Sequence, residues 1–201
     1  MTSADDDRSA NVARAKRLAR ERALAARDAL SPAERARRSA LICARAAALP
    51  ELTHAASVML VASFRSEVDT VPLMRWSLER GMSVALPRVR GPRLLEAVRI
   101  ADPATDLVPG RWGIPEPRDG LPVVPPGRID AVVVPGAAFS VDGARCGYGG
   151  GFYDTYLPGL AQGTPRVALA FEAQIVDELT CEPHDLAVDA IVTETRVIRP
   201  G

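Results

Sequence analysis

Short apolar runs alternate with segments of helical preference along most of the chain, and this alternation constrains the fold more than any other feature. A short, β-branched apolar run is typical of a strand that is buried on both faces. Strands that alternate with helices build a mostly parallel sheet with helices on both sides. We therefore predict a three-layer α/β fold. The expected strands are 57–63, 82–86, 94–100, 131–134, 166–170 and 190–193, and the expected helices between them are 70–80 and 153–160.

Two helices are expected to precede this core. Residues 12–30 are rich in Ala, Leu and Arg, which are strong helix formers. The second helix begins with a capping-box pattern, in which Ser31 is the N-cap and Glu34 reaches back to it. Pro32 occupies the first helical position, where a missing N–H is harmless, and Pro50 ends the pattern.

The chain has 201 residues, of which 47% are hydrophobic, enough for one domain with its own core. Residues 1–10 are polar and acidic, so we expect them to be disordered and residues 11–201 to form a single domain. Residues 102–128 are dense in Pro and Gly and are expected to form a long loop.

The charge balance limits the partners that the protein can have. Lys and Arg total 25, and so do Asp and Glu, which argues against a general nucleic-acid or anionic-membrane binder. The chain contains no apolar run long enough to span a membrane, and Cys43, Cys146 and Cys181 lie far apart without metal-site spacing. We expect a cytoplasmic monomer that binds small molecules, without nucleic-acid or membrane partners.

The segment that carries most chemical information follows the expected strand at 131–134. It contains Arg145 and a glycine-rich loop formed by Gly147, Gly149, Gly150 and Gly151. Glycine lets the backbone approach a ligand closely, and the adjacent helix start and arginine favour phosphate. The loop has no lysine for a Walker A motif, and Phe152 stands where the dinucleotide fingerprint needs glycine. The loop is therefore a phosphate loop of another type, or a structural turn.

Five sequence motifs occur in one order along the chain. The most specific is the run Gly143-x-Arg145-x-Gly147-x-Gly149-x-Gly151-Phe152-Tyr153-Asp154. The other four are Lys16–Arg20, Glu67–Thr70, Trp112–Pro117 and Asp185–Asp189. In these motifs the chain resembles the 5-formyltetrahydrofolate cyclo-ligase family. The departures are Cys146 for Leu, Phe152 for Tyr, and Gly150 and Thr155 at positions where relatives carry basic residues. We expect these changes to affect the affinity of the loop for its ligand more than they affect the reaction.

The resemblance implies an enzyme that uses ATP to cyclise 5-formyltetrahydrofolate to 5,10-methenyltetrahydrofolate, releasing ADP and phosphate. Such a reaction needs phosphate clamps, Mg²⁺ and a pterin pocket, because positioning and charge neutralisation dominate phosphoryl transfer. Two other functions stay open: a phosphosugar- or nucleotide-binding enzyme that uses the same loop, and a folate or nucleotide sensor that has lost turnover.

The resemblance also implies three sets of site residues. The ATP-binding set comprises Lys16, Arg20, Arg145, Gly147, Tyr148, Gly149, Gly150, Gly151, Phe152 and Tyr153, with catalytic roles for Lys16, Arg145 and Tyr153. The substrate-binding set comprises Ala62, Phe64, Glu67 and Trp112, and the Mg²⁺ ligands are Asp154 and Asp189.

Each of these residues also has a purely structural interpretation. The i,i+4 pair Lys16 and Arg20 can belong to a solvated helix face. Asp154 can be an acid that the helix dipole favours, and Asp189 can be an acid at a strand edge. Glu67 can be a turn residue before the next helix. Trp112 can be a packing anchor for the long loop.

Overall fold

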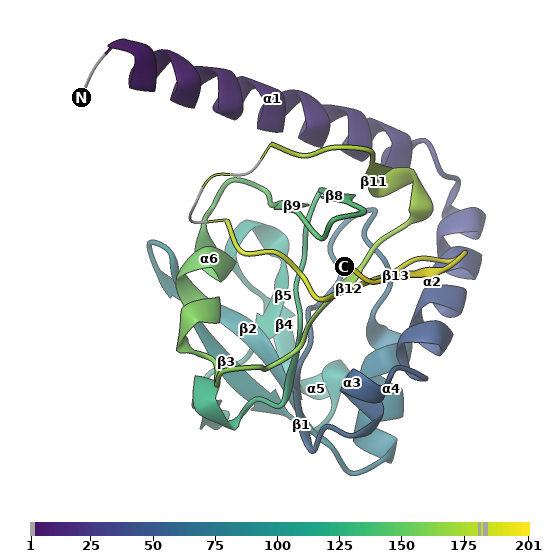
Figure 1. Ribbon diagram of the computed structural model, residues 1–201. Coiled ribbons are helices and arrows are strands. Elements are labelled where there is room, and N and C mark those ends of the chain that lie inside the picture. Colours follow the sequence, from purple (N-terminus) through teal and green to yellow (C-terminus); the bar gives the residue numbers. More distant parts are fainter. Residues whose placement is uncertain (1–2, 181, 183–184) are drawn as a thin grey trace.

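The apolar runs come together in one eight-stranded sheet with helices on both of its faces (Figure 1). This computed structural model describes residues 3–180, 182 and 185–201. The strands of the sheet are β1 Ser57–Met59, β2 Ser83–Gly91, β3 Leu94–Ile100, β6 Val123–Val124, β7 Ala131–Val133, β10 Arg166–Leu169, β12 Ala190–Val192 and β13 Val197–Ile198. Their order is β13-β12-β10-β7-β1-β2-β3-β6. The strands from β12 to β2 run parallel, and the remaining pairings at the two edges are antiparallel. The predicted α/β class is confirmed.

Neighbouring residues of each central strand face opposite sides of the sheet, so the core has two halves. Val58 and Val133 belong to the half covered by α2 and α4, whereas Met59 and Val132 belong to the half covered by α6. The helices are α1 Ser3–Asp28, α2 Pro32–Ala46, α3 Pro50–Thr53, α4 Val71–Glu79, α5 Pro103–Asp106 and α6 Phe152–Tyr156, with the 3-10 turns η1 Arg111–Gly113, η2 Pro126–Arg128, η3 Leu157–Gly159 and η4 Glu172–Gln174.

Both N-terminal helices are present, and the first starts earlier than expected. The helix α1 begins at Ser3, so residues 3–10, which we expected to be disordered, are helical in the structure. The segment from residue 3 to residue 28 contains neither Gly nor Pro, so nothing in it breaks a helix. The capping box of α2 is confirmed, because Glu34 N donates to Ser31 Oγ at 3.2 Å and Ser31 N donates to Glu34 Oε2 at 3.1 Å.

A second, small sheet joins α1 to the rest of the molecule. Its strands are β8 Ala138–Ser140, β9 Arg145–Cys146 and β11 Ile175–Val176, in the order β11-β8-β9. Figure 1 shows α1 lying across this sheet, and Ala23 is buried there against Ala138 and Cys146. The sequence pattern did not predict these strands. The small sheet matters for function because β9 leads directly into the glycine-rich loop.

The strand expected to end before Pro87 continues through it to Gly91. Pro87 lies opposite Ala97 in the antiparallel ladder between β2 and β3. A proline is tolerated in a strand where its missing N–H is not needed by the neighbour. The long loop at 102–128 contains the small hairpin of β4 Leu107–Pro109 and β5 Pro115–Pro117. None of the helices in the described part of the chain combines the length and apolarity needed to cross a bilayer.

Candidate active site

One face of α1 contacts the glycine-rich loop. Lys16, Arg20, Ala23 and Arg27 recur at the spacing of a single helix face. Arg20 Nε donates a hydrogen bond of 2.8 Å to the carbonyl oxygen of Gly147, and the Cys146 thiol donates to the carbonyl oxygen of Lys16 at 3.5 Å. The structure therefore brings the start of the chain to the loop that follows β9.

Lys16 is held by two carboxylates. Its Nζ lies 2.6 Å from Glu182 Oε2 and 2.5 Å from Asp185 Oδ2, and its side chain is only 14% exposed. Burial lowers the pKa of Lys16, but its hydrogen bonds to Asp185 and Glu182 outweigh burial and raise the pKa above its ordinary value. The interpretation as a solvated helix face is wrong for Lys16. A phosphate group that binds this ammonium has to replace or join the two carboxylates.

Arg145 and Tyr153 contribute buried polar atoms that lack partners. Arg145 is 7% exposed, forms an ion pair with Asp154, and donates to the carbonyl oxygen of Pro135 at 3.4 Å. Within the described residues, Arg145 Nε and the Tyr153 hydroxyl are buried without any hydrogen-bond partner. Burial raises the pKa of Tyr153 far above its ordinary value, so the hydroxyl keeps its proton and can donate. Buried polar groups are normally paired, so each of these two donors is available to a ligand.

The glycine-rich loop adopts backbone angles that favour glycine. Gly149 and Gly151 have φ angles of 92° and 66°, in the left-handed region. A β-carbon on Gly151 would lie 3.3 Å from Arg93 Nε, so a larger residue would also crowd the hairpin between β2 and β3. The helix that follows the loop, α6, has only five residues. The backbone N–H groups of the loop are therefore better candidates for binding a phosphate than the dipole of so short a helix.

Tyr148 connects this loop to the predicted substrate residue Glu67. The Tyr148 hydroxyl lies 2.5 Å from Glu67 Oε1 and accepts a hydrogen bond of 2.7 Å from Arg27 Nη1. Glu67 Oε2 accepts a hydrogen bond of 2.9 Å from the backbone N–H of Phe64. Glu67 is thus bonded both to the predicted ATP-binding loop and to the predicted substrate-binding segment, so it is more than a turn residue.

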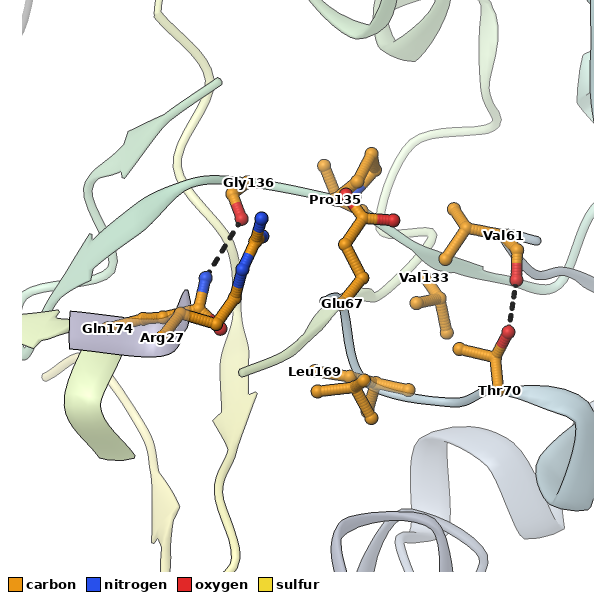
Figure 2. A pocket seen from close by; sticks show the side chains of 11 residues that line it. Arg27, Val61, Glu67, Thr70, Val133, Pro135, Gly136, Leu169 and Gln174 are labelled. Atoms are coloured by element: carbon orange, nitrogen blue, oxygen red, sulfur yellow. Dashed lines mark hydrogen bonds between the residues drawn. The ribbon is translucent and has the colours of Figure 1, made fainter. Parts of the chain in front are cut away.

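A pocket opens beside Glu67 at the carboxyl ends of β1, β7 and β10, the edge where parallel sheets bind ligands. In Figure 2, Arg27, Glu67 and Gln174 project toward it. Gln174 Nε2 donates to the carbonyl oxygens of Gly136 and Ala137 at 3.3 and 2.9 Å, which fixes the turn after β7. The pocket is lined by Arg27, Val61, Glu67, Val68, Thr70, Val133, Val134, Pro135, Gly136, Leu169 and Gln174.

Trp112 of η1 contacts Phe152, the first residue of α6, and Phe64 lies near the neighbouring Gly113. The Trp112 and Phe152 rings lie edge to face with their centroids 6.1 Å apart. A β-carbon on Gly113 would lie 3.9 Å from the Phe64 ring. Trp112 is 60% exposed and has a φ angle of 59°, so it is not a buried packing anchor. Of the four predicted substrate residues, only Glu67 lines the pocket; Phe64 and Trp112 are not part of its lining, and Ala62 packs against the core.

The two predicted metal ligands are both paired with arginines. Asp189 stands at the amino end of β12, and its carboxylate accepts hydrogen bonds from the Arg166 side chain at 3.2 and 3.1 Å and from the Arg166 N–H at 2.7 Å. It does not line the pocket, so the strand-edge interpretation describes its place. Asp154 uses one carboxylate oxygen for Arg145, and among the described residues none donates to the other oxygen. The described part of the chain contains no group of three or more potential metal ligands.

Arg27 is a pocket residue that the sequence analysis missed. It is 5% exposed and lies at the C-terminal end of α1, two turns beyond Arg20 on the same face. That spacing was the available signal. Because α1 contains many arginines, the sequence alone did not show which of them face the protein.

Fold and site together define an α/β protein with a candidate small-molecule site at the carboxyl edge of a parallel sheet. An anionic ligand group would suit this site, because Arg20 lies against the backbone of the glycine-rich loop. In addition, Arg145 Nε and the Tyr153 hydroxyl are buried donors without a partner among the described residues. The pocket beside Glu67 combines polar side chains with apolar ones such as Val61, Val133 and Leu169, as small-molecule sites commonly do.

Comparison with known proteins identifies the family. The model of the 5-formyltetrahydrofolate cyclo-ligase family matches residues 12–194, and the chain belongs to this family. It is 33% identical over 175 residues to the 5-formyltetrahydrofolate cyclo-ligase of Escherichia coli K12, a match that covers 85% of this chain and 96% of that one. The mouse cyclo-ligase is 29% identical over 176 residues, covering 83% of this chain and 87% of that protein.

Solved structures agree with this assignment. The chain matches 5,10-methenyltetrahydrofolate synthetase of Aquifex aeolicus with a TM-score of 0.80 and 34% identity, covering 92% of both chains. A synthetase from Mycoplasma pneumoniae, at 22% identity and a TM-score of 0.73, supports the fold alone. The family and the fold inferred from the sequence motifs are confirmed, and membership makes the chain a ligase.

Proposed function

We propose that this chain uses ATP to cyclise 5-formyltetrahydrofolate to 5,10-methenyltetrahydrofolate, with release of ADP and phosphate. The observation that carries the proposal is the Tyr148 hydroxyl, which joins the cationic glycine-rich loop to the Glu67 pocket in a member of this family. A nucleotide bound at the loop and a pterin bound in the pocket would then have their reacting groups side by side.

The chemistry needs an activated leaving group, because the formamide oxygen on N5 leaves poorly. Transfer of the γ-phosphoryl group to that oxygen makes it part of a phosphate. N10 then attacks the formyl carbon, the carbon–oxygen bond breaks, phosphate departs and N10 loses its proton. Each step depends on positioning and on neutralising negative charge, rather than on a protein nucleophile.

The residues near the loop can supply that neutralisation. Arg20 is held against the loop backbone, and Arg145 Nε and the Tyr153 hydroxyl are donors in place before the ligand arrives. Donors that are already fixed stabilise developing charge without reorganisation. Glu67 accepts hydrogen bonds from pterin N–H groups, since each carboxylate oxygen can accept more than one. Phe64, Trp112 and Phe152 form aromatic walls for the folate.

We propose that Mg²⁺ binds through one protein ligand. Asp154 fits, because Mg²⁺ is usually bound by one or two carboxylates together with substrate phosphates and water. When bound, the ion would neutralise charge on the phosphoryl oxygens. Asp189 is not retained, because Arg166 occupies its carboxylate. The balanced charge of the chain supports small-molecule substrates rather than nucleic-acid or anionic-membrane partners, and we propose that the protein is a cytoplasmic monomer.

The test is to incubate the protein with 5-formyltetrahydrofolate and Mg-ATP and to follow the absorbance of the methenyl product. We expect the product to form only when both substrates and the protein are present. A sensor would bind the ligands without forming product, whereas a phosphosugar- or nucleotide-directed enzyme would consume ATP or another phosphate compound without needing folate.

Lys16→Ala is expected to raise the KM for ATP about tenfold to a hundredfold, with folate binding in the absence of nucleotide nearly unchanged. A charge-assisted hydrogen bond to phosphate contributes about 1.5–3 kcal/mol. Steady-state kinetics would measure the KM, and a parallel unfolding curve would report the effect of leaving Glu182 and Asp185 without the ammonium.

Arg17→Ala is the matched control, because Arg17 lies about 100° around the helix from Lys16 and its side chain is 65% exposed. Small and equal effects of the two substitutions on the KM for ATP would remove Lys16 from the nucleotide site.

A further inference from the structure

Arg27 is a buried cation whose charge is only partly balanced. Its closest carboxylate contact is Asp28 Oδ1, 3.6 Å from Nε, and the Asp28 side chain is 60% exposed. Nε also donates to Ser66 Oγ at 3.0 Å, and Nη1 donates to the Tyr148 hydroxyl at 2.7 Å. A buried guanidinium is costly unless its donors are used. These bonds occupy only part of the donors of the group, and the side chain projects toward the pocket in Figure 2.

Arg27 and Glu67 form a fixed donor–acceptor pair on the pocket wall. The Tyr148 hydroxyl accepts from Arg27 and donates to Glu67 at 2.5 Å, so one oxygen atom sets the spacing between the cation and the anion. Ser66 Oγ accepts a second hydrogen bond from Arg27, and the backbone N–H of Phe64 donates a second one to Glu67. A ligand that enters the pocket therefore meets N–H donors from Arg27 beside the acceptor oxygens of Glu67.

We propose that Arg27 recognises the 4-oxo group of the pterin ring and, together with Glu67, selects 4-oxo-pterins over 4-amino-pterins. One edge of a pterin presents a carbonyl acceptor at position 4 next to the N–H of N3 and the 2-amino group. Glu67 accepts from the two nitrogen donors, and the Arg27 guanidinium donates to the carbonyl oxygen. This inference rests on the proposed function, and it names the residues of the same site that select the pterin ring.

The selectivity follows from the pairing of donors and acceptors. A 4-amino group in place of the carbonyl would turn an N–H donor toward the guanidinium, leaving both groups unpaired. A site built to hydrogen-bond one group discriminates strongly against an analogue that lacks it. A purely structural Arg27, which only holds α1 against Ser66 and Tyr148, would instead affect every ligand of the pocket equally.

The experiment measures the binding of folic acid and its 4-amino analogue to the full chain by isothermal titration calorimetry. We expect the wild-type chain to bind the 4-oxo compound at least about tenfold more tightly. In Arg27→Met the ratio of the two affinities should fall, mainly through weaker binding of the 4-oxo compound. Part of the preference should remain, because the 4-amino analogue lacks the N3 proton that Glu67 accepts. Arg22→Met is the matched control, because Arg22 is exposed on the same helix, and it should leave both affinities unchanged.

Two results would overturn the assignment: no preference in the wild-type chain, or an equal loss of both affinities in a folded Arg27→Met. If Arg27→Met does not fold, Arg27→Lys serves instead, and it should keep a reduced preference because lysine donates without the fork of arginine. An unchanged ratio in Arg27→Lys would count against the assignment. Turnover of 5-formyltetrahydrofolate by the wild-type chain, measured separately, shows whether the proposed function or only the role of Arg27 has failed.

Discussion

Replacing Arg145 by methionine is expected to lower kcat/KM by about a hundredfold to a thousandfold, the usual effect of removing one preorganised donor from a site of developing charge. The Arg145 side chain is 5% exposed, its Nε has no partner among the described residues, and it contacts both Asp154 and the turn after β7. Initial rates at varied ATP and folate concentrations would measure the loss.

The same substitution should also destabilise the protein, because it leaves the Asp154 carboxylate partly buried and unpaired. Breaking a buried pair costs about 3–5 kcal/mol, and we expect the lower end because the Asp154 side chain is 25% exposed. The double variant Arg145→Met, Asp154→Leu should recover most of the stability, since an apolar pair can replace a buried ion pair. Its turnover should stay low, because it lacks both the Arg145 donor and the proposed Mg²⁺ ligand Asp154. Recovery of turnover together with stability would contradict the proposed roles of both residues.

Glu67→Gln is expected to raise the KM for 5-formyltetrahydrofolate about tenfold to a hundredfold. A hydrogen bond to a charged group contributes about 1.5–3 kcal/mol, and glutamine would turn an N–H₂ donor toward the N–H groups of the pterin. The structure adds a second cause, because Glu67 also receives the Tyr148 hydroxyl and the Phe64 N–H. Steady-state kinetics with each substrate varied in turn would measure the effect.

The KM for ATP at saturating folate should change by less than about twofold in this variant, because Glu67 is proposed to contact the pterin and not the nucleotide. Glu79→Gln is the control, because Glu79 is an exposed acid at the end of α4. If Glu67→Gln raised both KM values by the same factor, Glu67 would belong to the loop architecture rather than to the folate pocket.

The parts of the fold that follow an apolar pattern could be predicted from the sequence. The strand β3 has the expected bounds, Leu94–Ile100, because the segment is a single short apolar run. The small sheet of β8, β9 and β11 was missed, since strands of two or three residues carry no periodicity. Pro87 was taken as an end because proline usually ends a strand, whereas its place in the β2–β3 ladder tolerates it.

The site was predictable to the extent that local motifs define it. The motifs placed Arg20, the glycine-rich loop and Glu67 in one site, and the structure brings these residues together through Gly147 and Tyr148. Asp189 has the residue type of a metal ligand, but its environment depends on Arg166 in the neighbouring strand. Arg27 was missed for a similar reason, because tertiary contacts decide which arginines of a helix face inward.

The most direct test of the central claim is the stoichiometry of a complete reaction. The purified chain would be supplied with limiting 5-formyltetrahydrofolate and excess Mg-ATP, and ADP, phosphate and the methenyl product would each be quantified. The proposed mechanism predicts equal amounts of all three, because one phosphoryl transfer activates one formyl oxygen. Methenyl product formed without ATP, or ADP formed at the same rate without folate, would contradict it.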